Sequence, residues 1–347
     1  MIFALDATPL TVPTGGIRRY TESLSRALAF HYPADEFHLI SDQPFEFDHA
    51  HLPNLHAQTI PARRWWSLQL PRTLKQMNAD LFHGMDFAVP YLPTRPSVLT
   101  LHDLSPWRSS QPTRVRRRTP ILLRTGIATM VITPSETIRK EAIEHFGLKP
   151  ERVAAIPLAA SETFRPVNVK PPAKPYFLFV GTLEPRKNIA RLVEAWREVR
   201  KQHAVELWIA GRTRDDFAPP QIEPGLRLLG VVPDKELPAL YSGTAAFLYP
   251  SFYEGFGLPV LEAMRCGALV ITSRDPAITE VTGGTAGIHI EADDLKALAE
   301  AMRSSLTRNH GPMRAQALAR AREFSWHATA RCTREVYDEA IRVFSRS

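Results

Sequence analysis

The chain has 347 residues and an ordinary composition, which together exclude several classes of protein. At roughly 100–200 residues per domain, this length predicts two domains. Apolar residues at 44% and charged residues at 23% exclude a chain that is disordered throughout. A net charge of +7 leaves nucleic acid, an anionic membrane surface and a phosphate-bearing substrate open as partners.

The cysteines and the apolar runs indicate the cellular compartment of the protein. Two cysteines, Cys266 and Cys332, form neither a disulfide framework nor a zinc knuckle, which favours a reducing compartment. No apolar run approaches the ~18 residues of a membrane span, and the first residues read as a strand and not as a signal peptide. We therefore expect a cytoplasmic protein, with peripheral contact to the inner face of the cytoplasmic membrane left open.

Strands and helices alternate over the first half of the chain. A strand at 2–7 is followed by a loop and by a helix whose apolar residues, Ile17, Tyr20, Leu24 and Leu28, recur at helical spacing. Further strands are predicted at 37–41, 80–83, 97–102, 130–133 and 152–157. Between the last two lies a helix with Ser135 as its N-cap and Gly147 as its stop. This alternation predicts a parallel α/β sheet.

The pattern restarts after a linker with four prolines at 162–175. Strands are predicted at 176–181, 205–211, 226–230, 245–250, 268–272 and 287–290, with helices between them and a last helix from Ser325. We predict a first domain at 1–165, a second at 166–325 and a closing helix at 326–347. Two doubly wound domains that face each other across a cleft would bind ligands beyond the carboxyl ends of their strands.

Small and polar residues follow strands of the first domain. Gly15 and Gly16 stand directly before a helix, whose free N–H groups suit an anion, although a plain strand-to-helix turn would use the same glycines. The dinucleotide fingerprint and the P-loop are both missing, which argues against a nicotinamide oxidoreductase and an ATPase. His102 and Asp103 end another strand, where a ligand-side role and a capping role are both open.

Two cations follow the first strand of the second domain. Arg186 and Lys187 in GTLEPRKN stand close to the next helix N-terminus, an arrangement that suits a diphosphate or an exposed basic turn. Fixed cations aimed at a departing diphosphate can replace a metal ion. Since the chain has no D-x-D motif, we predict metal-independent chemistry without a cofactor.

The segment PSFYEGFGLPVLEAM, residues 250–264, is the most specific in the chain. It places Glu254 in a loop and Glu262 eight residues later at the start of a helix, with Pro259 in the first turn. Carboxylates are well suited to accept hydrogen bonds from sugar hydroxyls. The backbone N–H groups of residues 255–258 are suited to a phosphate.

These motifs resemble a known family. GTLEPRKN, LGVVPDKELPALY and PSFYEGFGLPVLEAM, with the E-x7-E spacing of its two glutamates, are similar to the retaining nucleotide-sugar glycosyltransferases of family 4, which have the GT-B fold. TGGIRRY, TLHDL, ITPSETIRKEA and the closing FSW fit the same family. The chain looks most similar to mannosyltransferases of bacterial O-antigen and exopolysaccharide assembly. It departs from many relatives at Thr182, where they have Arg, and at PLAAS (157–161), where they have an Asn-Gly turn.

The resemblance implies a role for each matching residue. Arg186 and Lys187 would bind the donor diphosphate, Glu254 the hydroxyls of the transferred sugar, and Glu262 the ribose. His102 would lie near the reacting carbon. Further donor contacts are implied at Gly15, Gly16, Val232, Gly255, Phe256, Gly257 and Leu258. The closing helix would cross back onto the first domain.

The implied activity is transfer of a hexose, with mannose from GDP-mannose as the expected donor, to a saccharide or lipid-linked saccharide acceptor in cell-surface polysaccharide synthesis. The family implies retention of configuration, with front-face attack in which the departing phosphate takes the proton of the acceptor. A UDP- or dTDP-sugar donor is the alternative within the same fold. A nucleotide-sugar binding protein without catalysis and a nucleic-acid binder are alternatives of another class. The chain shows no helix-turn-helix, RNP-like aromatic pair or zinc site, so we expect no nucleic-acid partner.

One stretch carries positive charge without any acidic residue. Residues 104–135 include six arginines, among them Arg116, Arg117 and Arg118, and Trp65 with Trp66 lies in the same half of the chain. Arginine with tryptophan is a composition typical of membrane interfaces. We hypothesise that these five residues dock on anionic lipid at the acceptor side; a solvated charged face is the alternative.

Overall fold

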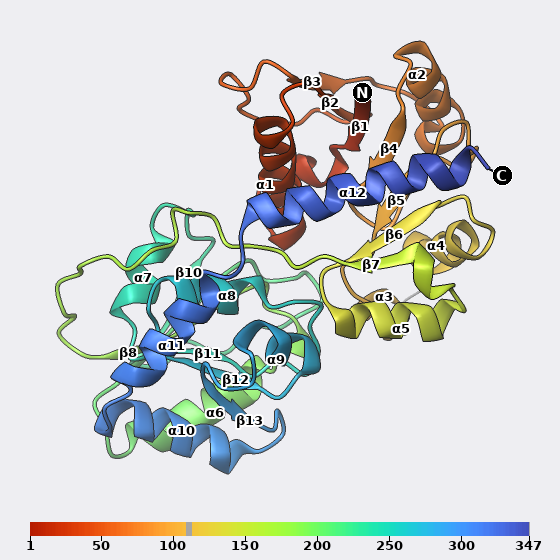
Figure 1. Cartoon of the computed structure of the whole chain (residues 1–347). Helices are drawn as coiled ribbons and strands as arrows, with labels where there is room; N and C mark the ends of the chain where they lie inside the picture. Colours follow the sequence, from red (N-terminus) through yellow and green to blue (C-terminus); the bar gives the residue numbers. More distant parts are fainter. Residues whose placement is uncertain (109–112, 347) are drawn as a thin grey trace. The chain divides into compact units, whose positions relative to one another are not determined.

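The computed structural model describes residues 1–108 and 113–346, and the chain forms two compact units (Figure 1). The first unit comprises Met1–Leu158 and Ser325–Ser347, and the second comprises Ala159–Phe324. The predicted division lies near residue 165, whereas the chain enters the second unit at Ala159. Phe164 explains the difference, since its ring lies 6.0 Å from that of Tyr241 and its carbonyl accepts a hydrogen bond from Arg265 Nε, both within the second unit.

The first unit is built on a parallel sheet, as the strand–helix alternation predicted. Within the described residues this sheet has seven strands in the order β3-β2-β1-β4-β5-β6-β7. The strands are β1 (Ile2–Asp6), β2 (Glu36–Ser41), β3 (Leu55–Thr59), β4 (Leu81–Gly84), β5 (Ser97–Thr100), β6 (Met130–Thr133) and β7 (Val153–Ala155). Because all these pairings are parallel, the carboxyl ends lie along one edge of the sheet.

Helices and short turns connect these strands. They are η1 (Thr8–Thr11), α1 (Gly16–His31), η2 (Trp65–Gln69), α2 (Leu70–Gln76), α3 (Ser105–Arg108), α4 (Arg114–Arg124), α5 (Glu136–Phe146) and η3 (Pro150–Arg152). The predicted caps of α5 are confirmed, since Ser135 Oγ accepts a hydrogen bond from the Ile138 N–H at 3.2 Å and Gly147 has a φ of 66°. The sequence analysis did not predict β3, whose LHAQT segment is half-polar because it forms the sheet edge, nor α4, which is basic and contains Pro120.

The last helix, α12 (Trp326–Phe344), belongs to the first unit and packs on α1 and on strands β4 to β6 (Figure 1). Its buried positions include Thr333, Val336, Tyr337 and Ala340, which recur at helical spacing. Tyr337 is fully buried, with its ring 5.0 Å from that of Phe3 on β1. The chain therefore starts and ends in the same core.

The second unit has its own parallel sheet, with strand order β10-β9-β8-β11-β12-β13. Its strands are β8 (Tyr176–Val180), β9 (Glu206–Ala210), β10 (Leu226–Gly230), β11 (Ala246–Tyr249), β12 (Val270–Ser273) and β13 (Ile288–Ile290). Its helices are η4 (Pro185–Lys187), α6 (Ile189–Arg200), α7 (Leu237–Gly243), α8 (Leu258–Arg265), α9 (Pro276–Thr282), α10 (Leu295–Thr307) and α11 (Gly311–Ala321). Every residue of the central strands β8 and β11 is buried, as expected for a sheet covered on both faces.

Among the helices of the described residues, none combines the length and the apolar character that crossing a bilayer requires.

Candidate active site

Two loops of the second unit are joined at the carboxyl edge of its sheet. One follows β8 and the other follows β11, the strand paired with it. The Phe252 N–H donates to the Arg186 carbonyl at 2.8 Å, and Asn188 Nδ2 donates to the carbonyls of Pro250 (3.2 Å) and Ala292 (2.7 Å). Asn188 has a φ of 58°, a left-handed conformation that asparagine tolerates. These bonds fix the backbone from which the predicted cations and carboxylates project.

An ion cluster lies where the loops meet. Glu254 Oε1 accepts from Lys187 Nζ at 2.5 Å, and Glu254 Oε2 accepts from an Arg186 terminal nitrogen at 2.9 Å. Arg186 Nε also lies 2.8 Å from Glu184, and Lys187 Nζ donates to the Tyr249 hydroxyl at 2.7 Å. Lys187 and Glu254 are 4% and 5% exposed. The structure therefore brings three of the predicted site residues into one network, to which Glu184 and Tyr249 are additions that the sequence analysis missed.

The charges of this cluster support one another. Burial raises the pKa of Glu254, but Lys187 and then Arg186 outweigh it and hold that pKa at about 2. Burial lowers the pKa of Lys187, against the opposing effect of Glu254. Burial also raises the pKa of Tyr249 well above 10, so its hydroxyl stays protonated at neutral pH. Glu254 is thus a fixed carboxylate whose ionisation depends on both cations.

The structure pairs the predicted sugar-binding carboxylate with the two predicted phosphate-binding cations. Glu254 bridges the two cations that were expected to hold a diphosphate by themselves. The Arg186 side chain is 27% exposed, compared with 6% for Lys187. A ligand anion would therefore reach Arg186, while Lys187 acts as the buried counter-ion that positions Glu254.

Glu262 lies elsewhere on its helix than predicted. It is the fifth residue of α8 and not in the first turn, which begins at Leu258 after Gly257 with a φ of 96°. Glu262 is 1% exposed and accepts a hydrogen bond from the Tyr241 hydroxyl on α7 at 3.0 Å. The helix dipole therefore does not explain this buried carboxylate, because the dipole acts within the first turn.

The other predicted donor residues of the second unit occupy the loops at this edge. Phe256 is buried, with its ring 5.9 Å from that of Phe324. Gly255 and Leu258 are also buried, whereas Val232, in the loop after β10, is half-buried. Their assignment to the donor stays a prediction.

Asp275 is a further residue that the sequence analysis missed. Its Oδ2 accepts from the Glu254 N–H at 3.2 Å, and its Oδ1 accepts from the Ile278 N–H at 3.1 Å, which caps α9. Burial raises the pKa of Asp275 to about 6, and the charge of Glu254 adds to this effect. An Asp-Pro pair two residues after a buried strand, with Pro276 at the helix start, is the signal that would have found it.

In the first unit, Gly15 and Gly16 form the start of α1. Gly15 is the N-cap residue with a φ of 139°. A Cβ atom built on either glycine would meet no heavy atom within 4 Å. The packing of the unit therefore does not require glycine at Gly16, and the space beside the helix N-terminus is open to a ligand.

His102 follows β5 and has a fixed tautomer. Its Nε2 lies 2.8 Å from the Met85 carbonyl, which can only accept, so Nε2 carries the proton and Nδ1 is an acceptor. Burial lowers the pKa of His102 against the opposing effects of the Met85 carbonyl and Asp103. The ring is therefore neutral at pH 7, and its edge packs against Tyr20 at a centroid distance of 4.9 Å.

A buried hydrogen-bond network reaches Tyr20, the ring that packs against His102, and the sequence analysis did not predict this network. The imidazole of His83 on β4 joins the Tyr337 hydroxyl (Nδ1, 2.6 Å) to Thr100 Oγ1 (Nε2, 2.8 Å), and Thr100 in turn contacts the Tyr20 hydroxyl at 2.9 Å. Burial lowers the pKa of His83 to about 3. This neutral network ties α12 to the ring that packs against His102.

Three aspartates lie at the same sheet edge: Asp6 ends β1, Asp86 follows β4 and Asp103 follows β5. Burial raises the pKa of Asp6 to about 6, while two hydrogen bonds from Thr8 oppose the rise. Burial raises the pKa of Asp86 to about 8, and Asp6 and then Asp103 add to the rise. Asp86 is therefore mainly protonated at neutral pH. Its position just after a strand is the same signal that singled out His102.

The predicted lipid-contact residues do not all lie at the surface. Trp65 is 4% exposed, so its assignment to a membrane interface is wrong: the side chain belongs to the core of the first unit. Trp66 is half-buried and contacts the Phe82 ring edge-to-face at 6.3 Å. Arg116 to Arg118 lie on α4 as half-buried or exposed residues, and Arg118 donates to the Tyr91 hydroxyl at 2.6 Å. Residues 109–112 of the acid-free stretch lie outside the described residues.

One group in the described part of the chain has the composition of a metal site. Glu36, His38 and His56 offer ligand atoms that lie within 4.8 Å of one another. They stand toward the amino ends of β2 and β3, whereas His102 follows the carboxyl end of β5. A metal ion there would not reach the chemistry at the carboxyl edge, and metal independence stays a prediction.

Comparison with known proteins supplies the family. The family described as "Glycosyltransferase Family 4" matches residues 14–163, and "Glycosyl transferases group 1" matches residues 160–324. The O-antigen chain mannosyltransferase B of Escherichia coli is 31% identical over 94% of this chain and 96% of its own length. The O-antigen chain mannosyltransferase RfbU of Salmonella typhimurium is 27% identical over 69% of this chain and 68% of its own.

Solved structures agree on the fold. Sucrose-phosphate synthase from Thermosynechococcus elongatus superimposes with a TM-score of 0.77 at 20% identity, over all of both chains. WaaG, a glycosyltransferase involved in lipopolysaccharide biosynthesis, gives 0.73 at 15% identity, over 97% of this chain and 99% of its own. The chain therefore belongs to the family 4 glycosyltransferases, is a hexosyltransferase, and has the GT-B fold of two Rossmann-like domains.

Proposed function

We propose that this glycosyltransferase moves mannose from GDP-mannose to a saccharide or lipid-linked saccharide in cell-surface polysaccharide synthesis. The observation that carries the proposal is the buried Glu254, which is held ionised by Lys187 and Arg186 at the carboxyl edge of the sheet. The names of the similar Escherichia coli and Salmonella proteins favour mannose. A UDP-sugar donor is the second candidate, because the Anabaena protein Alr3699/HepE, with a TM-score of 0.74 at 18% identity, was solved with UDP-glucose.

The cluster suits a reaction in which a diphosphate departs. Breaking the sugar–phosphate bond builds negative charge on the leaving group, and the half-buried Arg186 guanidinium can donate to it. Each oxygen of Glu254 accepts from one cation, and a carboxylate oxygen has two lone pairs, so Glu254 could also accept from a sugar hydroxyl. Glu254 would thus fix the sugar while Arg186 stabilises the leaving group.

Retention of configuration and metal independence are part of the proposal. The departing phosphate would take the proton of the acceptor hydroxyl as that hydroxyl attacks from the same face. Neutral His102, with Nδ1 as an acceptor, would orient a sugar hydroxyl without adding positive charge. Glu262 and Val232 would contact the nucleoside.

Donor choice is tested by thermal unfolding with GDP-mannose, UDP-glucose and dTDP-glucose. A donor present at ~100 times its Kd stabilises the protein by about 2.7 kcal/mol. We expect GDP-mannose alone to give this shift and to support transfer, and the product linkage to be α by proton NMR. An equal or larger effect of UDP-glucose would replace GDP-mannose by the second candidate, and an inverted product would refute retention.

Catalysis is tested with Glu254→Ala and Lys187→Ala. Both variants are expected to lose nearly all transfer while keeping the far-ultraviolet circular dichroism of the wild type. Transfer at the wild-type rate in both variants would refute the assignment. EDTA-treated protein is expected to keep its activity; a loss restored by Mg²⁺ or Mn²⁺ would refute metal independence.

We also propose that α4 docks on anionic lipid near the acceptor. Arg114, Arg116 and Arg117 lie in the first turns of this helix, where the dipole favours acidic residues, so their charge is not explained by helix stability. Each arginine near an anionic surface contributes about 1 kcal/mol. Flotation with phosphatidylglycerol vesicles should be lost when Arg116, Arg117 and Arg118 are changed to Glu. Unchanged flotation would refute the docking of α4 on anionic lipid.

A further inference from the structure

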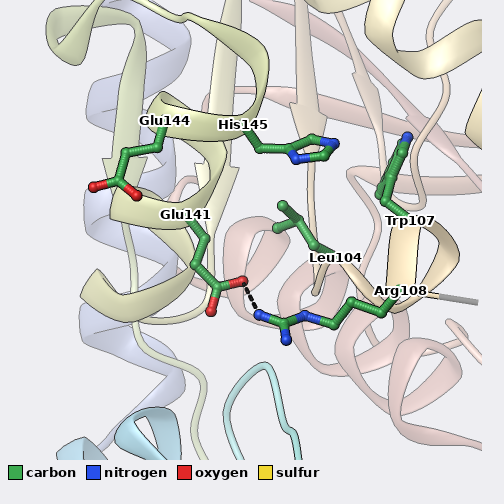
Figure 2. A pocket seen from close by; sticks show the side chains of 6 residues that line it. All are labelled: Leu104, Trp107, Arg108, Glu141, Glu144 and His145. Carbon is green, nitrogen blue, oxygen red and sulfur yellow. Dashed lines mark hydrogen bonds and ion pairs between the residues drawn. The ribbon is translucent and has the colours of Figure 1, made fainter.

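A pocket of about 460 Å³ opens in the first unit between α3 and α5 (Figure 2). It is lined by Leu104, Trp107, Arg108, Glu141, Glu144 and His145. Its volume falls within the range of about 300–1,000 Å³ typical of small-molecule sites. Neither the donor cluster nor the His102 network uses these side chains.

The pocket combines flat rings with carboxylates. The rings of Trp107 and His145 lie side by side, with centroids 6.1 Å apart and planes inclined at 59°, and Figure 2 shows the pair of Arg108 and Glu141 along the opposite side. Arg108 donates to Glu141 at 3.2 Å. The Trp107 ring is held edge-to-face by Phe146, at a centroid distance of 5.0 Å. The pocket therefore has a rigid aromatic wall and a polar wall.

The charge of the lining selects against an anion. Two carboxylates, Glu141 and Glu144, outnumber the one guanidinium of Arg108, so a phosphate would meet net negative charge. A neutral polyol fits this lining, because carboxylate oxygens accept from hydroxyls and the guanidinium donates to them. The C–H face of a hexose pyranose ring packs on an aromatic ring as other apolar surface does.

The position of the pocket connects it to the reaction. Leu104 lies two residues after His102, and α3 begins directly after Leu104. The Phe87 ring contacts both His102 and Trp107, at centroid distances of 6.4 and 6.0 Å. A saccharide in the pocket would therefore lie one ring away from the histidine expected at the reacting carbon.

We propose that this pocket is a subsite for an uncharged hexose unit of the acceptor. The assignment of this hexose to the acceptor rests on the proposed function, whereas the binding of a neutral saccharide rests on the pocket alone. Trp107 would stack on the sugar ring, and Glu141 with Arg108 would fix its hydroxyls.

The test measures saccharide binding without donor. Methyl α-D-mannopyranoside and α-1,2-mannobiose are titrated into the full-length protein, and the Kd is read from saturation-transfer NMR. Trp107→Ala should raise the Kd at least about tenfold, and Trp107→Phe, which keeps a flat ring, should restore most of the affinity. Glu141→Gln should also raise the Kd about tenfold, which corresponds to about 1.4 kcal/mol.

The matched control is Glu136→Gln on the same helix. Glu136 also pairs with an arginine, Arg139, at 2.9 Å, but it does not line the pocket, so its variant should bind saccharide with the wild-type Kd. Glu141→Gln removes no core side chain and therefore keeps the test valid if Trp107→Ala fails to fold.

The outcomes separate the two proposals. Wild-type saccharide affinity in both Trp107→Ala and Glu141→Gln would overturn the subsite, and so would the absence of saturation transfer to either saccharide in the wild type. The Kd for GDP-mannose, measured in parallel, should be the same in all variants. If GDP-mannose fails to bind while saccharide binding depends on Trp107 and Glu141, the donor proposal fails and the subsite stands.

Discussion

The replacement of Glu254 by Gln tests the central interaction of the site. The change keeps the shape of the side chain but leaves Lys187, which is 4% exposed, without its carboxylate. The pKa of Glu254 falls from 4.5 to about 2 in the folded chain. At about 1.4 kcal/mol for each pH unit, this difference corresponds to about 3 kcal/mol in favour of the ionised form. Breaking a buried pair from one side costs about 3–5 kcal/mol in general, which agrees.

The sign of the pH dependence is set by the lowered pKa. The contribution of Glu254 to the unfolding free energy is complete above pH 4.5, where the unfolded carboxyl is ionised. It is lost as the pH falls toward about 2, where the folded carboxylate takes up its proton. The wild type should therefore lose about 3 kcal/mol more than Glu254→Gln between about pH 5 and pH 2.

The assay is urea unfolding of the full chain, followed by the fluorescence of tryptophans such as the fully buried Trp196 of the second unit. Glu254→Gln combined with Lys187→Met removes both charges, and it should be more stable than the sum of the two single effects predicts. Glu300→Gln is the matched control, because Glu300 forms an exposed pair with Arg303 at 3.0 Å that contributes about 0–1 kcal/mol.

Two results would refute the reasoning about this cluster. One is a loss of stability in Glu254→Gln no larger than that of Glu300→Gln. The other is full additivity in the double variant. The double variant also separates folding from function, because it should be folded and yet inactive in mannose transfer.

Three further predictions concern the first unit. Gly16→Ala should keep the stability of the wild type or gain up to about 1 kcal/mol, because the new Cβ meets no heavy atom within 4 Å. If the backbone approaches the donor phosphate, the same change should raise the Kd for GDP-mannose about tenfold. An unchanged Kd would remove this glycine from the site. The raised pKa of Asp86 means that its folded form holds a proton that the unfolded form releases, so its contribution to stability should fall by up to about 1.4 kcal/mol per pH unit as the pH rises from about 4 to 8. Asp86→Asn should remove this slope from pH-dependent unfolding curves between about pH 6 and 8, above the raised pKa values of Asp6 and Asp275. Tyr337→Phe should cost about 1–3 kcal/mol, since it leaves His83 Nδ1 buried without its partner, and calorimetry should show a lower Tm for the unfolding of the first unit; an unchanged Tm would contradict a structural role for the network.

The sequence could predict the two sheets and the edge on which the site lies. Parallel strands buried on both faces read as short apolar runs, and the residues directly after each run are carried to the same edge. Arg186, Lys187 and Glu254 were found in this way, and the structure joins them directly. The edge strand β3 and the helix α4 were not predicted, since β3 is half-polar and α4 is rich in arginine and contains Pro120.

The sequence could not predict the partners of the site residues. Spacing alone gave Glu262 a place beside a helix start, whereas its neighbour Tyr241 comes from α7, 21 residues earlier. The arginines beside Trp65 favour a surface position for it, yet its side chain is buried. No pattern in the neighbouring sequence indicates this burial. His83 is 254 residues from Tyr337, and only the return of α12 to the first unit brings them together.

These differences have one physical origin, which also indicates where function is encoded. Local rules place a residue at the end of a strand, but the charge it carries there depends on groups brought in from elsewhere. Glu254 is ionised because Lys187 and Arg186 arrive from the loop after β8, and Asp86 is protonated because burial, reinforced by Asp6 and Asp103 from the ends of β1 and β5, disfavours its charge. A carboxylic acid is therefore a fixed anion in the second unit and mainly protonated at neutral pH in the first. A family motif identifies such positions, and the packing around them determines their chemistry.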